Sequence, residues 1–183
     1  MKISARLVGE RIVLRNYRTS DLPFLTEMWF DAENGKYLSD PTAAFVNDVY
    51  QRVLDDLENS KDGYYLVAET ALGGVPVGSA VIFPTADGVY DIGYCVHKNH
   101  WRQGFGSEIV ALLLEWLTDH GAERVMAEVA TDNLPSNRLL QKFGFAVERK
   151  SSFQKYNMDV RFDSCIYARK IKAEAVEAHA EKG

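Results

Sequence analysis

The strongest constraint on the fold is a strand-helix-strand pattern in the middle of the chain. An apolar run at 89–96 leads through a polar loop into a long amphipathic segment that opens with Gly104 and Gly106. That segment keeps its apolar side chains on one face at helical spacing, and Gly121 is well placed to end it. Another apolar run follows at 125–129. Two strands joined by a helix in this way must pair in parallel, through a right-handed crossover.

Shorter patterns on either side predict further strands and helices. Apolar runs bounded by turn residues predict strands at 12–14, at 64–69, at 75–83 where Pro84 should stop the strand, from Phe145 onward, and at 160–168. Helical spacing predicts a helix after the caps Ser20 and Asp21, a second at 42–59 with Phe45, Val49, Val53 and Leu57 at four-residue intervals, and a short one from Pro135 to Phe143.

The turns between the strands indicate how they pair. Gly73-Gly74 and Asp87-Gly88 form short links, so the strands between residues 64 and 96 should be antiparallel neighbours. We therefore predict a single-domain α/β (α+β) fold with a mixed, mostly antiparallel twisted sheet and helices on both faces.

Length and composition bound the class of protein. The chain has 183 residues, 46% of them hydrophobic and 26% charged, as is usual for one globular domain. We expect residues 1–170 to form that domain and residues 171–183 to be a helical extension or a flexible tail. The net charge of −5 argues against nucleic acid as the main partner. Charges interrupt the early apolar residues, so we expect no membrane segment and a cytoplasmic location. Cys95 and Cys165 are too few for a disulfide framework.

The glycines before the long helix have a chemical reading as well as a structural one. A helix N-terminus presents unbonded N–H groups, and its dipole attracts anions. Gly104 and Gly106 would let a phosphate approach the backbone, and Arg102 adds a positive charge. The alternative is that the glycines only permit a tight turn. The loop lacks the Gly-Lys-Ser/Thr of a P-loop and the three-glycine dinucleotide motif.

A second motif follows about 30 residues later and gives the first one a family context. Asn133-Leu-Pro-Ser136 opens a helix that ends at Gly144. The two motifs together resemble the GNAT superfamily of acetyl-CoA-dependent N-acetyltransferases, and residues 11–168 follow that family's order of elements. The segment Asp91-Ile-Gly-Tyr94, with residues 11–15, is similar to the branch that includes ribosomal-protein N-terminal acetyltransferases.

The resemblance implies a binding site for acetyl-CoA in a gap between two splayed parallel strands. The pantetheine arm would pair with the backbone of Tyr94, Cys95 and Val96, and Asn133 would bind its amide. The phosphates would be held by main-chain N–H groups of Arg102, Gln103, Gly104, Phe105, Gly106 and Ser107. The resemblance implies no metal.

Two positions depart from the family pattern. Trp101 stands where Gln or Arg is commonest, although Trp is frequent there in the ribosomal-protein branch. Leu140 stands where many relatives carry a tyrosine that acts as general acid toward the departing thiolate. The usual acid is therefore missing.

Catalytic candidates follow from position. Asp91 lies on the strand of Tyr94 and is our candidate base, because an attacking ammonium must lose a proton. Its alternative role is that of an ordinary surface carboxylate. Ser136 is the candidate hydrogen-bond donor to the cofactor sulfur, and its alternative role is that of a helix cap. Tyr94 could also be a core aromatic residue that only packs.

Other reactive residues have weaker claims. Cys95, in an apolar strand, is better explained as packing than as a nucleophile. His97 and His100 lack the companions that a metal site needs.

The expected function is transfer of the acetyl group of acetyl-CoA to a primary amine, by direct attack in a ternary complex. A protein N-terminus is the acceptor that the branch resemblance favours. A small amine, such as a polyamine, an amino acid or an aminoglycoside-like compound, is the alternative. A non-catalytic acyl-CoA sensor is a further alternative, supported by Leu140. We expect neither nucleic acid nor membrane as a partner, and a homodimer is one possible assembly.

Overall fold

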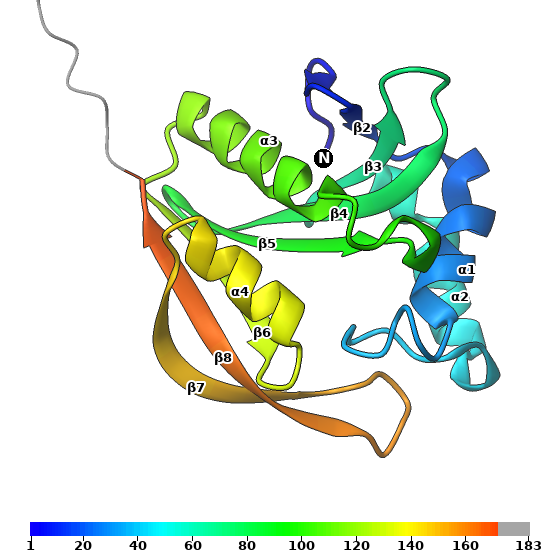
Figure 1. The fold of residues 1–183 in the computed structure, drawn as a ribbon. Helices are drawn as coiled ribbons and strands as arrows, with labels where there is room; N and C mark the ends of the chain where they lie inside the picture. The colour runs from blue at the N-terminus through cyan, green and yellow to red at the C-terminus, as the bar shows by residue number, and fades with distance from the viewer. Residues whose placement is uncertain (172–183) are drawn as a thin grey trace, which may run out of the picture.

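A computed structural model describes residues 1–171 of the chain (Figure 1). Its helices are α1 (Leu22–Phe30), α2 (Asp48–Asp55), α3 (Phe105–Asp119) and α4 (Leu134–Lys142). Its strands are β1 (Leu7–Val8), β2 (Ile12–Asn16), β3 (Tyr64–Thr70), β4 (Pro76–Ala86), β5 (Val89–Val96), β6 (Arg124–Ala130), β7 (Ala146–Gln154) and β8 (Arg161–Lys170).

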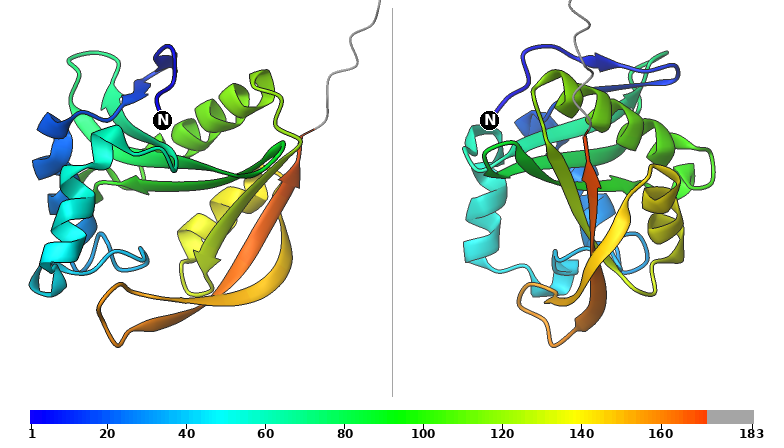
Figure 2. Two further views of the ribbon diagram at one scale, coloured as in Figure 1. Left: turned by 180° about the vertical axis from the view of Figure 1, so that it is seen from behind. Right: turned by 90° about the vertical axis from the view of Figure 1, so that its left-hand side faces the viewer.

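One twisted sheet of eight strands forms the centre of the molecule. Its order is β1-β2-β3-β4-β5-β6-β8-β7 (Figure 2). Every neighbouring pair is antiparallel except β5 and β6, which α3 connects in parallel. The predicted fold class is confirmed, including the parallel pair at 89–96 and 125–129.

Helices cover the two faces of this sheet. Residues of α3 and α4 share one buried cluster with one face of the strands, from Ile12 to Tyr167. Residues of α1 and the α2 region, among them Leu25 and Leu54, form a second cluster on the other face around Val67. The sheet is therefore covered by α3 and α4 on one face and by α1 and α2 on the other.

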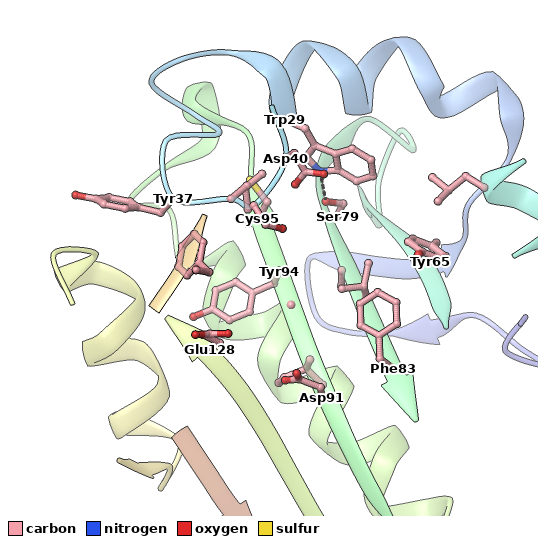
Figure 3. Close-up of a pocket in the computed structure, with 18 of the residues that line it drawn as sticks. Trp29, Tyr37, Asp40, Tyr65, Ser79, Phe83, Asp91, Tyr94, Cys95 and Glu128 are labelled. Carbon is pink, nitrogen blue, oxygen red and sulfur yellow. Dashed lines mark hydrogen bonds between the residues drawn. The ribbon is translucent and has the colours of Figure 1, made fainter. Parts of the chain in front are cut away.

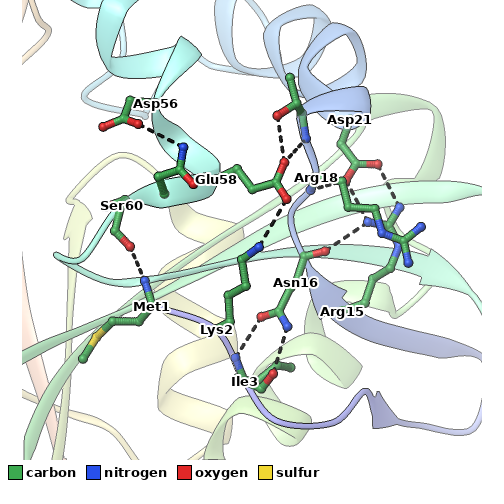
Figure 4. Close-up of polar contacts among 12 residues, drawn as sticks. Met1, Lys2, Ile3, Arg15, Asn16, Arg18, Asp21, Asp56, Glu58 and Ser60 are labelled. Atoms are coloured by element: carbon green, nitrogen blue, oxygen red, sulfur yellow. Dashed lines mark hydrogen bonds and ion pairs between the residues drawn. The ribbon is translucent and has the colours of Figure 1, made fainter.

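A buried ion cluster fixes α1 to the sheet (Figure 4). The guanidinium of Arg15 on β2 donates to both carboxylate oxygens of Asp21 at 2.7 and 2.8 Å, and to Glu69 on β3 at 2.6 Å. Asp21 directly precedes α1, and it also accepts from the backbone N–H of Arg18 at 2.9 Å. Because each charge has several partners, the cluster offsets the cost of its own burial.

The predicted helix at 42–59 is wrong in its extent. Asn47 caps a helix that begins at Asp48, since its side chain accepts from the N–H of Tyr50 at 2.9 Å. Residues 43–45 and 57–59 are separate 3₁₀ turns. The four-residue spacing also does not mark one buried face: Phe45, Val49 and Val53 are 45%, 54% and 57% exposed, while Leu57 is buried.

Pro84 does not stop its strand, contrary to expectation. Strand β4 continues to Ala86, with an irregular register opposite β5 between Pro84 and Ala86. Its pairing with β3 ends earlier, at Ile82. The position lacking an N–H therefore lies where one edge of the strand is unpaired, which is where a sheet tolerates proline.

The remaining boundaries shift by a few residues, and β1 was not foreseen. Apart from Ile171, the predicted tail at 171–183 lies outside the described residues, so that prediction stays open. Within residues 1–171, the helices are all too short or too polar to cross a membrane.

Candidate functional site

The parallel pair β5–β6 opens after three residue pairs. Val89, Tyr90 and Asp91 face Arg124, Val125 and Met126, and no later residues of the two strands pair. Beyond Asp91, β5 stays with β4 up to Val96, and β6 stays with β8 up to Ala130. The expected splayed strand pair is thus present, and Asp91 stands at its vertex.

The glycine loop lies at the open end of the splay. Gly104 caps α3 with φ of 86°, a left-handed conformation that favours glycine. The first backbone hydrogen bonds run from Ser107 and Glu108 to the carbonyl of Gly104, at 3.0 and 3.2 Å. The N–H groups of Phe105 and Gly106 precede this bonded turn. The loop therefore has the geometry of an anion site.

Gly106 serves close packing as well. A Cβ at this position would lie 3.3 Å from Leu139 on α4 and 3.7 Å from Val96 on β5. The first turn of α3 consequently lies tight against both other elements of the site. Glycine at position 106 is therefore explained by the close packing of α3 against α4 and β5.

Arg11 holds this loop, a role that its place in the sequence does not indicate. Its side chain donates to the carbonyl of Gln103 at 2.8 Å and to Glu108 at 3.1 Å. It also lies 5.0 Å from the ring centroid of Phe105. A basic residue just before a strand is too common a signal to have indicated this contact.

Trp101 has a structural role that explains its place in the motif. Its indole N–H donates to the carbonyl of Val96 at 2.8 Å, and the side-chain amide of Asn34 donates to the same oxygen at 3.2 Å. The loop is thereby tied to the end of β5. The carbonyl of Val96 is not free to pair with a pantetheine arm, contrary to what we expected of that group.

Helix α4 brings Ser136 to Tyr94. The Oδ1 atom of Asn133 accepts from the N–H of Ser136 at 3.4 Å, so Asn133 is the cap and Ser136 is not. The Ser136 Oγ atom lies 2.7 Å from the phenol oxygen of Tyr94. Burial raises the pKa of Tyr94 to about 12, and its bond to Ser136 opposes the rise. Leu140 is fully buried in the core and supplies no polar group.

A cavity of about 370 Å³ lies beside the splay, on the face that carries α1 and α2 (Figure 3). Strand β5 lines it from Asp91 to Cys95, and Glu128 of β6 lines it opposite. Aromatic side chains make much of the remaining wall: Trp29, Tyr37, Tyr50, Tyr65, Phe83 and Phe153. The expected base therefore lies in a hollow rather than on an open surface.

Carboxylates supply the charge of this cavity, with Asp40, Asp91 and Glu128 in its wall and neither lysine nor arginine among its described lining residues. Burial raises the pKa of Asp91, and the negative charge of Glu128 raises it further. Glu128 was missed, although it is the one charged residue in the predicted strand at 125–129. Ser164 donates to it at 2.5 Å.

Cys95 and the histidines behave as packing residues. Burial raises the pKa of the Cys95 thiol to about 12, and Asp40 adds to the rise. The side chain of Asn34 donates to its sulfur at 3.2 Å. His97 is buried against Phe24. Among the residues that the structure covers, no three His, Cys, Asp or Glu side chains are grouped closely enough to hold a metal ion.

A glycine-capped helix thus lies at the open end of a splayed strand pair, and a separate cavity lies on the opposite face of the sheet. The family description "Acetyltransferase (GNAT) domain" matches residues 11–146. The chain belongs to the GNAT acetyltransferase family.

Individual relatives agree with this assignment. The chain is 29% identical over 147 residues to the uncharacterized N-acetyltransferase p20 of Bacillus licheniformis, a match that covers 78% of this chain and 83% of the relative. A GNAT-family acetyltransferase structure from Bacillus anthracis superposes with a TM-score of 0.74 at 20% identity, covering 91% of this chain and 98% of the other. The ribosomal-protein-alanine N-acetyltransferase of Brucella melitensis gives 0.67 at 21% identity, covering 86% and 99%.

Proposed function

We propose that the protein transfers the acetyl group of acetyl-CoA to a primary amine by direct attack, with both substrates bound at once. The observation that carries this proposal is the position of Asp91. It stands at the vertex of the splay and in the wall of the cavity, where a donor between the strands and an acceptor in the cavity would meet.

The donor would be held by backbone more than by side chains. Acetyl-CoA supplies an activated acetyl thioester when bound. The N–H groups of residues 102–106 would bind its phosphates, whereas the N–H of Ser107, which we also expected to bind them, already donates to the carbonyl of Gly104. Arg102 would add charge, and Asn133 would bind the pantetheine amide. The backbone of Tyr94 and Cys95 and the N–H of Val96 would align the arm along β5.

Asp91 would accept the proton of the attacking ammonium, directly or through a water molecule. Its partly buried setting beside Glu128 raises its pKa, which makes it a better proton acceptor than an ordinary exposed carboxylate. Ser136 would donate a hydrogen bond to the departing thiolate. Tyr94, held in its protonated form by burial, would donate a hydrogen bond to the Ser136 hydroxyl.

The acceptor that we favour is a peptide N-terminus. The carboxylates and aromatic rings of the cavity suit an ammonium with a short apolar continuation. The fold shared with a protein named ribosomal-protein-alanine N-acetyltransferase supports the same acceptor. A small amine is the second candidate, because a cavity of about 370 Å³ also accommodates a whole molecule of modest size.

The test is a thiol-release assay with acetyl-CoA and a panel of acceptors. The panel should contain peptides with free and blocked N-termini, polyamines, amino acids and aminoglycosides. Turnover of free but not of blocked peptides would support the favoured acceptor, and turnover of small amines alone would replace it. Binding of acetyl-CoA without turnover of any amine would contradict the enzymatic proposal and identify a sensor.

A further inference from the structure

Lys155 is a buried lysine that the proposed chemistry does not use. It follows β7 directly, in the link to β8, and only 4% of its surface is exposed. Its ammonium donates to the carbonyls of Gly35 at 2.9 Å, Leu38 at 2.6 Å and Asp40 at 2.7 Å. All three protons of the ammonium therefore have an acceptor.

The three carbonyls belong to one segment, the loop between α1 and α2. Four consecutive residues of that loop, 37–40, line the acceptor cavity. The beginning of the loop is fixed elsewhere, because Asn34 accepts from the N–H of Lys98 at 2.5 Å. The part that faces the cavity is fixed mainly by the hairpin that carries Lys155 (Figure 1).

Neighbours of Lys155 in the hairpin make parallel contacts to the same loop. The N–H of Tyr156 donates to the carbonyl of Ser39 at 2.7 Å, and the side chain of Asn157 donates to the carbonyl of Phe45 at 2.9 Å. The ring of Tyr156 lies 4.8 Å from that of Tyr50, which in turn donates to Asp40. Lys155 is the member of this group that reaches furthest inward.

Burying an ammonium costs free energy, and here the hydrogen bonds to the three carbonyls must offset that cost. Burial lowers the pKa of Lys155, and the nearby Asp40 opposes the lowering. Three charge-assisted hydrogen bonds to successive turns of one loop are a strong cross-link. The matched family region ends at residue 146, before this hairpin.

We propose that Lys155 is a positioning residue for the acceptor: its cross-link holds residues 37–40 as a wall of the cavity and so determines how tightly the amine binds. Lys155 itself does not line the cavity; it lies behind the lining residues Leu38 and Asp40 and acts through them. This inference rests on the proposed function, since it assigns the acceptor to that cavity.

The test compares Lys155→Met with Lys150→Met, which alters an exposed lysine of the preceding strand β7. In Lys155→Met we expect the KM for the amine to rise about tenfold or more, because small misplacements of binding groups are costly. The KM for acetyl-CoA should stay within about twofold, since Lys155 contacts neither the glycine loop before α3 nor α3 itself. Lys150→Met should leave both constants unchanged. Equal KM values for the amine in the two variants, or an equal rise of both constants in Lys155→Met, would overturn the inference.

Hydrogen exchange followed by mass spectrometry provides a readout that needs no turnover. Amides of residues 35–40 should exchange faster in Lys155→Met, with α3 and β5 unchanged. Unchanged exchange there would overturn the inference even in an active enzyme, whereas a wild-type protein inactive toward every amine would overturn the proposed function instead. If Lys155→Met does not fold, Lys155→Gln keeps two donors and should show the same changes to a smaller extent. A Gln variant that folds with wild-type exchange and KM would contradict the inference.

Discussion

The phenol oxygen of Tyr94 lies 2.7 Å from the hydroxyl oxygen of Ser136, which joins β5 to the first turn of α4. Since burial raises the pKa of Tyr94 to about 12, the phenol keeps its proton near neutral pH. A protonated phenol can donate to Ser136, and the serine proton is then free to point toward a cofactor sulfur. We propose that this pair takes over the role of the tyrosine that many relatives carry at the position of Leu140.

Ser136→Ala should therefore slow turnover while the protein still folds. We expect kcat and kcat/KM to fall together by roughly 10- to 100-fold, as for one proton-transfer group. The melting temperature should fall somewhat, because the buried Tyr94 hydroxyl loses its partner, although the cap of α4 at Asn133 is untouched. Asn133→Ala is the matched comparison and should cost about 1 kcal/mol of stability. A Ser136→Ala enzyme with full kcat would remove the residue from the mechanism.

Asp91→Asn should lower kcat and abolish the acidic limb of the pH–rate profile, with acetyl-CoA affinity nearly unchanged. The base works only when deprotonated, and its pKa is raised, so the limb should lie above the usual carboxylate range. Glu128→Gln removes the neighbouring charge and should move the limb to lower pH. A profile that neither substitution alters would show Asp91 to be an ordinary carboxylate.

Residues near in sequence made much of the fold predictable. The glycine turns and the pattern from residue 89 to residue 129 specify the hairpin, the crossover helix and the parallel pair, since each depends on local spacing. The prediction of one helix at 42–59 was wrong because four-residue spacing cannot reveal a break at Asn47, which depends on a local side-chain cap. The prediction that Pro84 ends its strand was wrong because a strand tolerates proline where its neighbour has stopped pairing. Where β3 stops pairing with β4 is a property of the whole sheet.

The site was predictable where a motif marks it and unpredictable where distant segments meet. The glycine loop, Asn133 and Ser136 stand in recognisable spacings. Arg11 reaches the loop from 92 residues away in sequence, and Lys155 reaches Gly35 from 120 residues away. No local pattern records such contacts, because only the folded sheet brings these segments together.

Asp21→Asn should destabilise the protein by about 3 kcal/mol at neutral pH, since it leaves a buried guanidinium with an incomplete set of partners. Burial raises the pKa of Asp21, but its bonds to Arg15 and to the N–H of Arg18 outweigh this and lower it below its ordinary value. A lowered pKa means that the stabilisation is complete above the unfolded value near 4 and is lost as the pH falls through the folded value. Urea unfolding should show the difference between wild type and variant shrinking below about pH 4.

The exposed Asp87→Asn serves as control for that experiment and should match wild type at every pH. A gap between Asp21→Asn and wild type that stays constant down to pH 2 would contradict the assigned role of the Asp21 charge.

Gly104→Val should weaken acetyl-CoA binding well over tenfold while the fold stays intact. Gly104 has φ of 86°, and a Cβ there would lie 3.1 Å from the guanidinium of Arg11, so a valine would disturb both the backbone cradle and the residue that holds it.

Gly121→Val is the matched control. Gly121 has φ of 74° at the opposite end of α3, with no atom within 4 Å of an added Cβ. Both variants should lose a similar 1–2 kcal/mol or so of stability from the left-handed conformation. Isothermal titration should then show lost affinity only in Gly104→Val. Equal affinities in the two variants would mean that the glycine permits a turn and nothing more.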